Sequence, residues 1–125
     1  MAGSTRTAIG HRWERQALEY LRSHGLEPIA ENYRCRLGEI DLIMRDRDCL
    51  VFVEVRYRGN SRFATAAESV DGLKQRKLIR AAALYLAGNP RLCDMPVRFD
   101  VIAVDAALAG QCTLQWLRDA FRAEA

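Results

Sequence analysis

Apolar residues recur along the chain with two periods, and each period predicts one type of element. Over residues 9–24 they fall three or four positions apart, as on one face of a helix, and Gly25 then provides a helix stop. A second helical pattern covers residues 70–87 and ends at Gly88, Asn89 and Pro90. We therefore predict two long helices, the second with six apolar residues on its inner face: Leu73, Leu78, Ala81, Ala82, Tyr85 and Leu86.

The segments between and after these helices have the patterns of strands. Residues 26–33 form a short extended segment, followed by GEIDLIMR at 38–45 and CLVFVEVRYR at 49–58. Residues 46–48 between the last two predict a hairpin turn. VRFDVIAVD at 97–105 is the next strand, and residues 113–117 indicate another before a short terminal helix. The order predicts an α/β sandwich, with one mixed sheet covered by helices.

Length and composition favour one domain. The chain has 125 residues, 50% of them hydrophobic and 28% charged, so we expect a flexible tail at residues 1–8 and a single domain at 9–125. No apolar run approaches the ~20 residues that span a bilayer, and the first residues lack the apolar block of a secretion signal. We therefore expect a cytoplasmic protein without membrane association. The four cysteines lack C-x-x-C spacing, which argues against a zinc site and a disulfide framework.

Positive charge is concentrated in one part of the chain. The formal net charge is only +3, but residues 56–80 hold seven basic and two acidic residues, a local charge of +5. Such a segment is typical of a protein that contacts phosphates on one face. A solvated helix face has the same composition, so both interpretations stay open.

Acidic residues occupy two strands where a half-buried strand does not need them. The strand period of two places Glu54 and Arg56 on one face of the segment 49–58, and Asp41 lies within the preceding strand. A hairpin closed by a two-residue loop pairs Asp41 with Glu54 and Glu39 with Arg56. This register predicts two carboxylates directly opposite each other.

Two such carboxylates repel each other by roughly 4 kcal/mol at ~4 Å and an effective dielectric constant of ~20. A shared proton, Arg56 or another cation, or a divalent metal must offset that repulsion. Mg²⁺ and Mn²⁺ prefer hard oxygen ligands of this kind. The alternative is a structural ladder of ion pairs, in which Glu39 pairs with Arg56 while Asp41 and Glu54 lie at a solvated edge.

A family resemblance rests on five runs: GHRWERQALEYLRSHG, GEIDLIMRD, LVFVEVRYR, KQRKLIRAAALYLA and VRFDVIAVD. Together they resemble the YraN family of uncharacterised bacterial proteins, which is similar to archaeal Holliday junction resolvases of the PD-(D/E)XK nuclease superfamily. The likeness covers residues 9–105. It implies a restriction-endonuclease-like fold with an αβββαβ core and a metal-dependent endonuclease that cleaves DNA, including branched or non-standard structures. It also implies Mg²⁺ or Mn²⁺ as the cofactor.

The resemblance also implies roles for individual residues. Asp41 and Glu54 match the catalytic acids, and with Glu14 on the first helix they would hold the metal. Arg56 takes the catalytic position usually held by Lys; it supplies charge and hydrogen bonds but cannot release its proton as a base. Six residues would bind the flanking nucleic acid: Arg58, Arg62, Lys74, Gln75, Lys77 and Arg80.

Two other functions stay open. A chain that lost turnover through Arg56 would be a non-catalytic nucleic-acid-binding module on the same fold. A protein-interaction adaptor would instead dock a partner through a sheet edge or through Trp116, Leu117 and Phe121. The sequence leaves open which DNA structure is preferred and whether the protein is a homodimer.

Overall fold

The structure is a computed structural model that describes residues 4–59, 65–106 and 112–123. Two helices and five strands make up the described part. A short 3₁₀ turn at Pro90–Leu92 lies between the second helix and the fourth strand. No helix in these ranges is both long enough and apolar enough to cross a bilayer. In chain order the elements are α1 (Ser4–Ser23), β1 (Glu27–Cys35), β2 (Gly38–Asp46), β3 (Cys49–Arg58), α2 (Gly72–Ala87), β4 (Val97–Ala106) and β5 (Cys112–Phe121).

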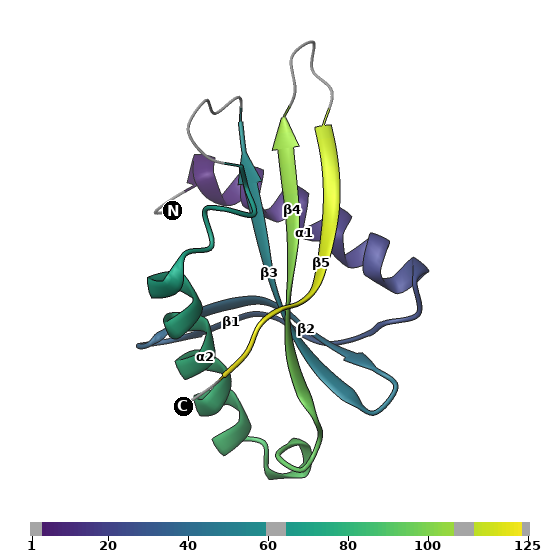
Figure 1. Ribbon diagram of the computed structural model, residues 1–125, viewed down its shortest axis with the longest axis vertical. Helices are drawn as coiled ribbons and strands as arrows, with labels where there is room; N and C mark the ends of the chain where they lie inside the picture. The colour runs from purple at the N-terminus through teal and green to yellow at the C-terminus, as the bar shows by residue number, and fades with distance from the viewer. Residues whose placement is uncertain (1–3, 60–64, 107–111, 124–125) are drawn as a thin grey trace.

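The five strands form one sheet in the order β1-β2-β3-β4-β5 (Figure 1). Strands β3 and β4 run parallel, and the other neighbours are antiparallel. Parallel neighbours need a crossover connection, and α2 lies within the segment that joins β3 to β4. The expected α/β class with its αβββαβ order is confirmed, and β5 is added at the sheet edge.

Helices α1 and α2 cover opposite faces of the sheet (Figure 1). Alternate side chains of β3 therefore enter different clusters: Val51 and Val53 pack under α1, while Leu50 and Phe52 pack under α2. The α1 cluster contains Ala17, Leu18 and Leu21, and the α2 cluster contains Leu78, Ala81, Ala82 and Tyr85.

Strands β2 and β3 separate halfway along their length, and this fork positions the candidate site. Their pairing runs from Asp46↔Cys49 to Leu42↔Val53, in the register that the two-residue loop predicts. Beyond Val53, β3 continues beside β4 up to Arg58, while the start of β2 continues beside β1. Asp41 and Glu54 are the first residues past the last pair.

A buried carboxylate that the sequence analysis did not identify fastens β5 to β4. Asp100 is 0% exposed and accepts hydrogen bonds from the Arg98 guanidinium at 2.9 and 3.1 Å. The Trp116 Nε1–H and the Asp119 backbone N–H, both on β5, donate to the same carboxylate at 2.9 and 3.0 Å. Arg98 also donates to Asp46 at 3.0 Å, so the network reaches the β2–β3 turn.

Three expectations about individual elements differ from the structure. Helix α1 begins at Ser4, so residues 4–8, assigned to a tail, continue the helical backbone; no Pro or Gly interrupts them. The terminal helix is wrong, because β5 continues to Phe121, which pairs with Phe99. Leu73 is 57% exposed, since five positions before Leu78 correspond to about 140° around a helix.

Candidate functional site

The fork brings together three carboxyl groups from three elements. Asp41 of β2 lies in the gap, and its Oδ2 accepts a hydrogen bond from the Val55 backbone N–H at 2.8 Å. This bond takes the place of the backbone pairing between β2 and β3, which ends at Val53. The Asp41 carboxyl also lies close enough to those of Glu54 on β3 and Glu14 on α1 for the three groups to shift one another's pKa. One side chain thus links acids that lie 13 and 27 positions away in the sequence.

The ion-pair ladder considered as an alternative is wrong. Asp41 is 8% exposed and Glu54 3%, so neither lies at a solvated edge. Glu39 pairs with Arg34 at 3.4 Å rather than with Arg56, because the strand that carries it has already parted from β3.

Two cations reach the buried Glu54. Lys74 of α2 places its Nζ 3.4 Å from Glu54 Oε2, and Arg56 places its Nη1 3.7 Å from the same oxygen. The Arg56 Nε donates to Ser69 Oγ at 2.9 Å, which fixes the guanidinium beside the acid. The strand period and the two-residue hairpin loop predict that both strand acids point toward the first helix. This is wrong for Glu54, because strand alternation places it on the α2 face with Phe52.

The charges of the three acids are incompletely balanced. Burial raises the pKa of Glu54 from 4.5 to about 8; the charge of Asp41 adds to the rise, while Lys74 and Arg56 oppose it. Burial, followed by the charge of Asp41, raises the pKa of Glu14 to about 8 as well. Burial also raises the pKa of Asp41, against the hydrogen bond from Val55. Without a further cation, this cluster holds protons near neutral pH.

The donor chemistry of the cluster fits a hard divalent cation. Its ligand atoms are all carboxylate oxygens, which Mg²⁺ and Mn²⁺ accept, and such an ion would replace the protons that the acids share. In the described ranges no three His, Cys, Asp or Glu side chains are already arranged around a metal position. Asp41 is engaged with Val55, and Glu54 with its two cations.

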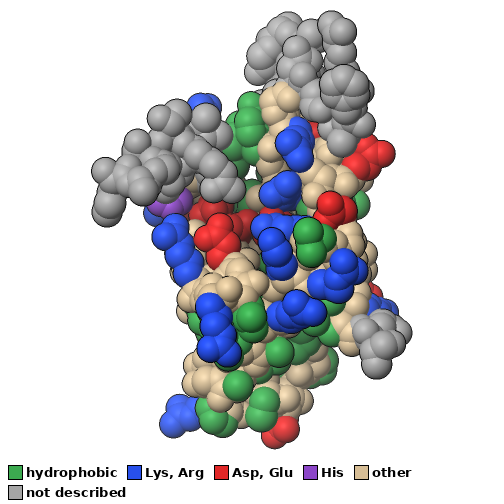
Figure 2. Space-filling model, turned by 90° about the vertical axis from the view of Figure 1, so that its left-hand side faces the viewer, with side chains coloured by type: hydrophobic (Ala, Val, Ile, Leu, Met, Phe, Trp, Pro, Cys, Tyr) green, Lys and Arg blue, Asp and Glu red, His purple; other side chains and the backbone are tan. Residues whose placement is uncertain are grey.

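An open cleft of about 310 Å³ surrounds the cluster. Figure 2 shows acidic side chains gathered in a hollow of this face with Lys and Arg side chains around them. Both helices and the first three strands contribute to the cleft, which exposes the acids to a ligand from solvent. Its lining residues are His11, Trp13, Glu14, Asn32, Arg34, Glu39, Asp41, Glu54, Val55, Arg56, Tyr57, Arg58 and Lys74.

The six predicted nucleic-acid contacts separate into different places. Arg58 and Lys74 line the cleft. Gln75 does not, since its Nε2 donates to the Val70 carbonyl at 3.1 Å and it borders a groove beside β5. Lys77 and Arg80 are exposed on α2 outside the cleft, and Arg62 lies outside the described residues.

Three cleft residues escaped the sequence analysis as site residues. Asn32 adopts a left-handed φ of 53° within β1, and its side-chain amide lowers the pKa of Glu14 against the rise caused by burial. Asn tolerates this conformation better than most residues, so a lone Asn in a strand was the available signal. Trp13 and Tyr57 stack with ring centroids 5.1 Å apart. Each directly adjoins a predicted site residue in the sequence, Glu14 and Arg56 respectively.

Comparison with known proteins identifies the family. Residues 13–104 match the model of the uncharacterised protein family UPF0102. The chain belongs to this family. The resemblance to the YraN family drawn from the five sequence runs is thereby confirmed.

UPF0102 proteins similar to this chain over most of its length occur in several bacteria. One from Pseudomonas putida strain GB-1 is 46% identical over 121 residues, covering 97% of this chain and 98% of the relative. One from Pseudomonas fluorescens strain Pf0-1 is 49% identical over 108 residues, covering 86% and 88%. One from Nitrosococcus oceani is 46% identical over 124 residues, covering 99% of both.

Among solved structures, the chain is similar to Pyrococcus furiosus SfsA in complex with Ca²⁺, with a TM-score of 0.36 and 12% sequence identity. The match covers 90% of this chain and 63% of SfsA. A likeness at this distance assigns no chemistry to the UPF0102 chain.

Proposed function

We propose that this UPF0102 protein is a metal-dependent endonuclease that hydrolyses phosphodiester bonds in DNA, with branched or otherwise non-standard structures as its substrates. One observation carries the proposal. Glu14, Asp41 and Glu54 converge from α1, β2 and β3 in an open cleft that also holds Arg56 and Lys74. The family resemblance read from the sequence supports the same reaction.

The three acids would hold Mg²⁺ or Mn²⁺. When bound, the ion would supply a lowered pKa for a coordinated water and positive charge beside the scissile phosphate. The Val55 N–H holds Asp41 in the fork, so this carboxylate is oriented before any ligand arrives. Glu54 lies beside Lys74 of α2 and Glu14 belongs to α1, so the three acids would enclose the ion from both layers of helices.

Arg56 and Lys74 would together take the role of the lysine that PD-(D/E)XK nucleases usually have at the position of Arg56. Arg56, oriented by Ser69, would stabilise negative charge that develops on the phosphate oxygens, but its guanidinium cannot act as a base. Lys74 was expected only to contact a flanking phosphate. Its position 3.4 Å from Glu54 supports a role inside the site, as a compact ammonium that orients water or the phosphate.

The positive residues around the cleft would bind the DNA backbone. Arg58 on its wall would contact phosphates next to the scissile one, and Lys77 and Arg80 would extend the path along α2. Such contacts set affinity and its salt dependence without reading sequence. A non-catalytic DNA-binding module is the second candidate, favoured by the Arg in place of Lys at position 56.

The test is cleavage of a labelled four-way junction and of a matched duplex in the presence of Mn²⁺. Wild type should cleave the junction, and Asp41→Asn should lose at least about 100-fold in rate. Glu39→Gln is the matched control, because Glu39 lines the same cleft but is paired with Arg34. If wild type binds DNA but does not cleave it, the non-catalytic binding module is the remaining candidate. If it binds no DNA, the protein-interaction adaptor is the remaining candidate.

A further inference from the structure

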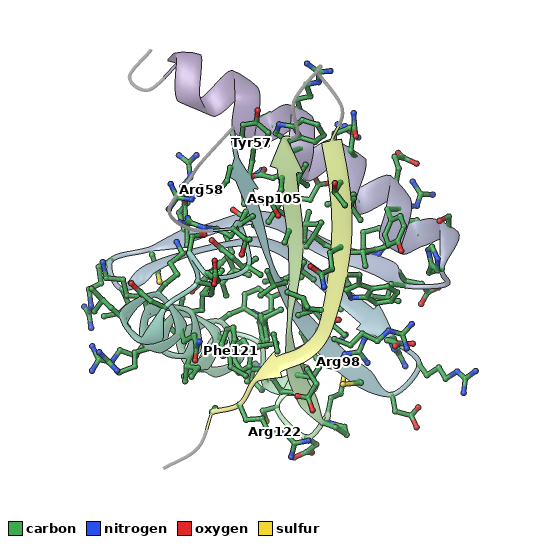
Figure 3. The ribbon with its side chains drawn as sticks, turned by 45° about the horizontal axis from the view of Figure 1, so that its top comes forward. Tyr57, Arg58, Arg98, Asp105, Phe121 and Arg122 are labelled. Carbon is green, nitrogen blue, oxygen red and sulfur yellow. The ribbon has the colours of Figure 1, made fainter. Side chains whose placement is uncertain are left out.

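An aromatic pair stands beside the acidic cluster in the same cleft. The Trp13 and Tyr57 rings are nearly parallel, with an interplanar angle of 14° and centroids 5.1 Å apart. Trp13 adjoins Glu14 on α1, and Tyr57 adjoins Arg56 at the end of β3. Figure 3 shows Tyr57 at this end of the strand, next to α1. Any nucleic-acid strand that reached the acids would pass close to these rings.

Core packing accounts for only part of this pair. Trp13 is half-buried and packs against the α1 cluster, but Tyr57 is 37% exposed and belongs to neither core cluster. Positive groups adjoin the rings: the Arg12 guanidinium lies 5.4 Å from the Trp13 ring centroid, and Arg58 lines the cleft next to Tyr57. An exposed aromatic surface among cations suits a ligand that combines flat rings with negative charge.

Unpaired nucleotides combine these two properties. A base freed from the duplex presents a flat face that stacks on aromatic side chains whatever its identity, while cations hold the backbone. Within a duplex the same face is covered by neighbouring bases. We propose that Tyr57, backed by Trp13, stacks on one unpaired base of a DNA strand whose phosphates lie in the acidic cleft. The inference rests on the proposed function and deepens it, since it narrows the non-standard DNA structures to those that present an unpaired nucleotide.

Direct binding of DNA in EDTA tests the inference without cleavage. The probes are a fluorescein-labelled oligothymidylate, a duplex of the same length and an oligomer of abasic residues, each followed by fluorescence anisotropy. Tyr57→Leu should weaken oligothymidylate binding by roughly 5-fold to 100-fold, the range expected for one stacked base, and leave duplex binding unchanged. Tyr57→Phe keeps the ring and should bind as wild type does.

Two further comparisons isolate the stacking. Wild type should bind the abasic oligomer more weakly than oligothymidylate, whereas Tyr57→Leu should bind the two oligomers alike. Tyr20→Leu is the matched control on α1, because Tyr20 contacts His24 and Trp116 outside the cleft, and its DNA affinity should not change.

The outcomes separate the two proposals. If wild type binds none of the probes, the proposed function is wrong and the inference falls with it. If wild type binds DNA but Tyr57→Leu retains full affinity for oligothymidylate, the stacking is wrong while the nuclease proposal stands. Equal losses on oligothymidylate and duplex, or a loss in Tyr57→Phe as large as in Tyr57→Leu, would also overturn the stacking.

Discussion

Two buried carboxylate sites in this chain contrast in how their charge is balanced. Asp100 is fully buried, and donors from Arg98, Trp116 and Asp119 surround its single charge. The cleft cluster instead joins Glu14, Asp41 and Glu54, and the cations Lys74 and Arg56 both approach Glu54. In Figure 3 Arg98 lies on the side of the molecule away from Tyr57 and Arg58, so the two sites occupy separate regions.

The difference lies in how many hydrogen-bond donors the fold supplies to each buried acid. Asp100 has its hydrogen bonds supplied by the fold, and its network joins β4, β5 and the β2–β3 turn. Glu14 and Glu54 of the cleft cluster have raised pKa values and lie in an open cleft where a cation from solvent has access. Burial alone would not distinguish the two sites; the number of donors for each carboxylate does.

The largest expected effect comes from removing the acid of the balanced site. Asp100→Ala leaves the Trp116 and Asp119 N–H groups without their acceptor and Arg98 with Asp46 as its remaining partner, and should lower the free energy of unfolding by about 3–5 kcal/mol. Asp41→Ala, at a nearly buried acid of the cleft cluster, should cost far less because it relieves repulsion. Urea unfolding followed by circular dichroism measures both variants. Equal losses would remove the distinction between the sites.

Substitution of Arg56 sharpens the contrast within the cleft. Arg56→Lys retains a positive charge beside Glu54, so Mn²⁺-dependent cleavage should persist or rise. Arg56→Ala removes a charge-stabilising donor and should lose roughly 100-fold or more in rate. Single-turnover cleavage of a junction gives the three rates. If wild type and both variants bind metal but none cleaves, the binding module replaces the nuclease.

The stability of the metal-free protein should depend on pH through the cleft acids. Glu14 and Glu54 have pKa values raised from 4.5 to about 8, so the folded state holds more protons than the unfolded state between these values. Their stabilising contribution is fully present below pH 4.5 and is lost as the pH rises through about 8. Urea midpoints in EDTA should therefore fall over this range, and Asp41→Asn should flatten the fall. A midpoint that rises, or a variant that follows wild type, would contradict the charge imbalance.

The smallest effect is expected on α2, outside both sites. Lys77→Gln should weaken binding to duplexes of different sequence about equally and reduce the slope of log affinity against log salt by ~1. Titrations at several salt concentrations measure that slope. Gln75→Ala is the matched control. Because Gln75 donates to the Val70 carbonyl, this variant should leave the salt slope unchanged. An unchanged slope for Lys77→Gln would assign this residue to a solvated helix face.

Local patterns predicted most of the fold and part of the site. The two-residue loop and alternating apolar residues were enough to predict the β2–β3 register as far as Leu42↔Val53. They could not show the strands parting there, because the fork depends on a carboxylate that bonds to the Val55 backbone. Glu14 entered only through the family resemblance, since nothing in its helical spacing marks it as a partner of Asp41.

Non-local contacts explain the errors at the end of β5 and at Lys74. The end of β5 has helix-forming residues, but Asp119 bonds to Asp100, 19 positions earlier, and adopts a left-handed φ of 50° at an irregularity of the β4–β5 pairing. The sequence predicts Lys74 only as a peripheral phosphate contact. It does not show the ion pair with Glu54, because this pair joins a helix to the sheet. Interactions between such distant residues leave no periodic signal in the sequence.

Calorimetric titration with Mn²⁺ tests the central claim, that the cleft acids form one cation site, most directly. Wild type should bind Mn²⁺, and Asp41→Asn and Glu14→Gln should each weaken the binding by at least about 10-fold. Glu39→Gln, in the same cleft but paired with Arg34, should weaken the binding less than either, because Glu39 acts on Glu14 and Asp41 only through its charge. Absence of Mn²⁺ binding by wild type, or undiminished binding by Asp41→Asn, would contradict the account.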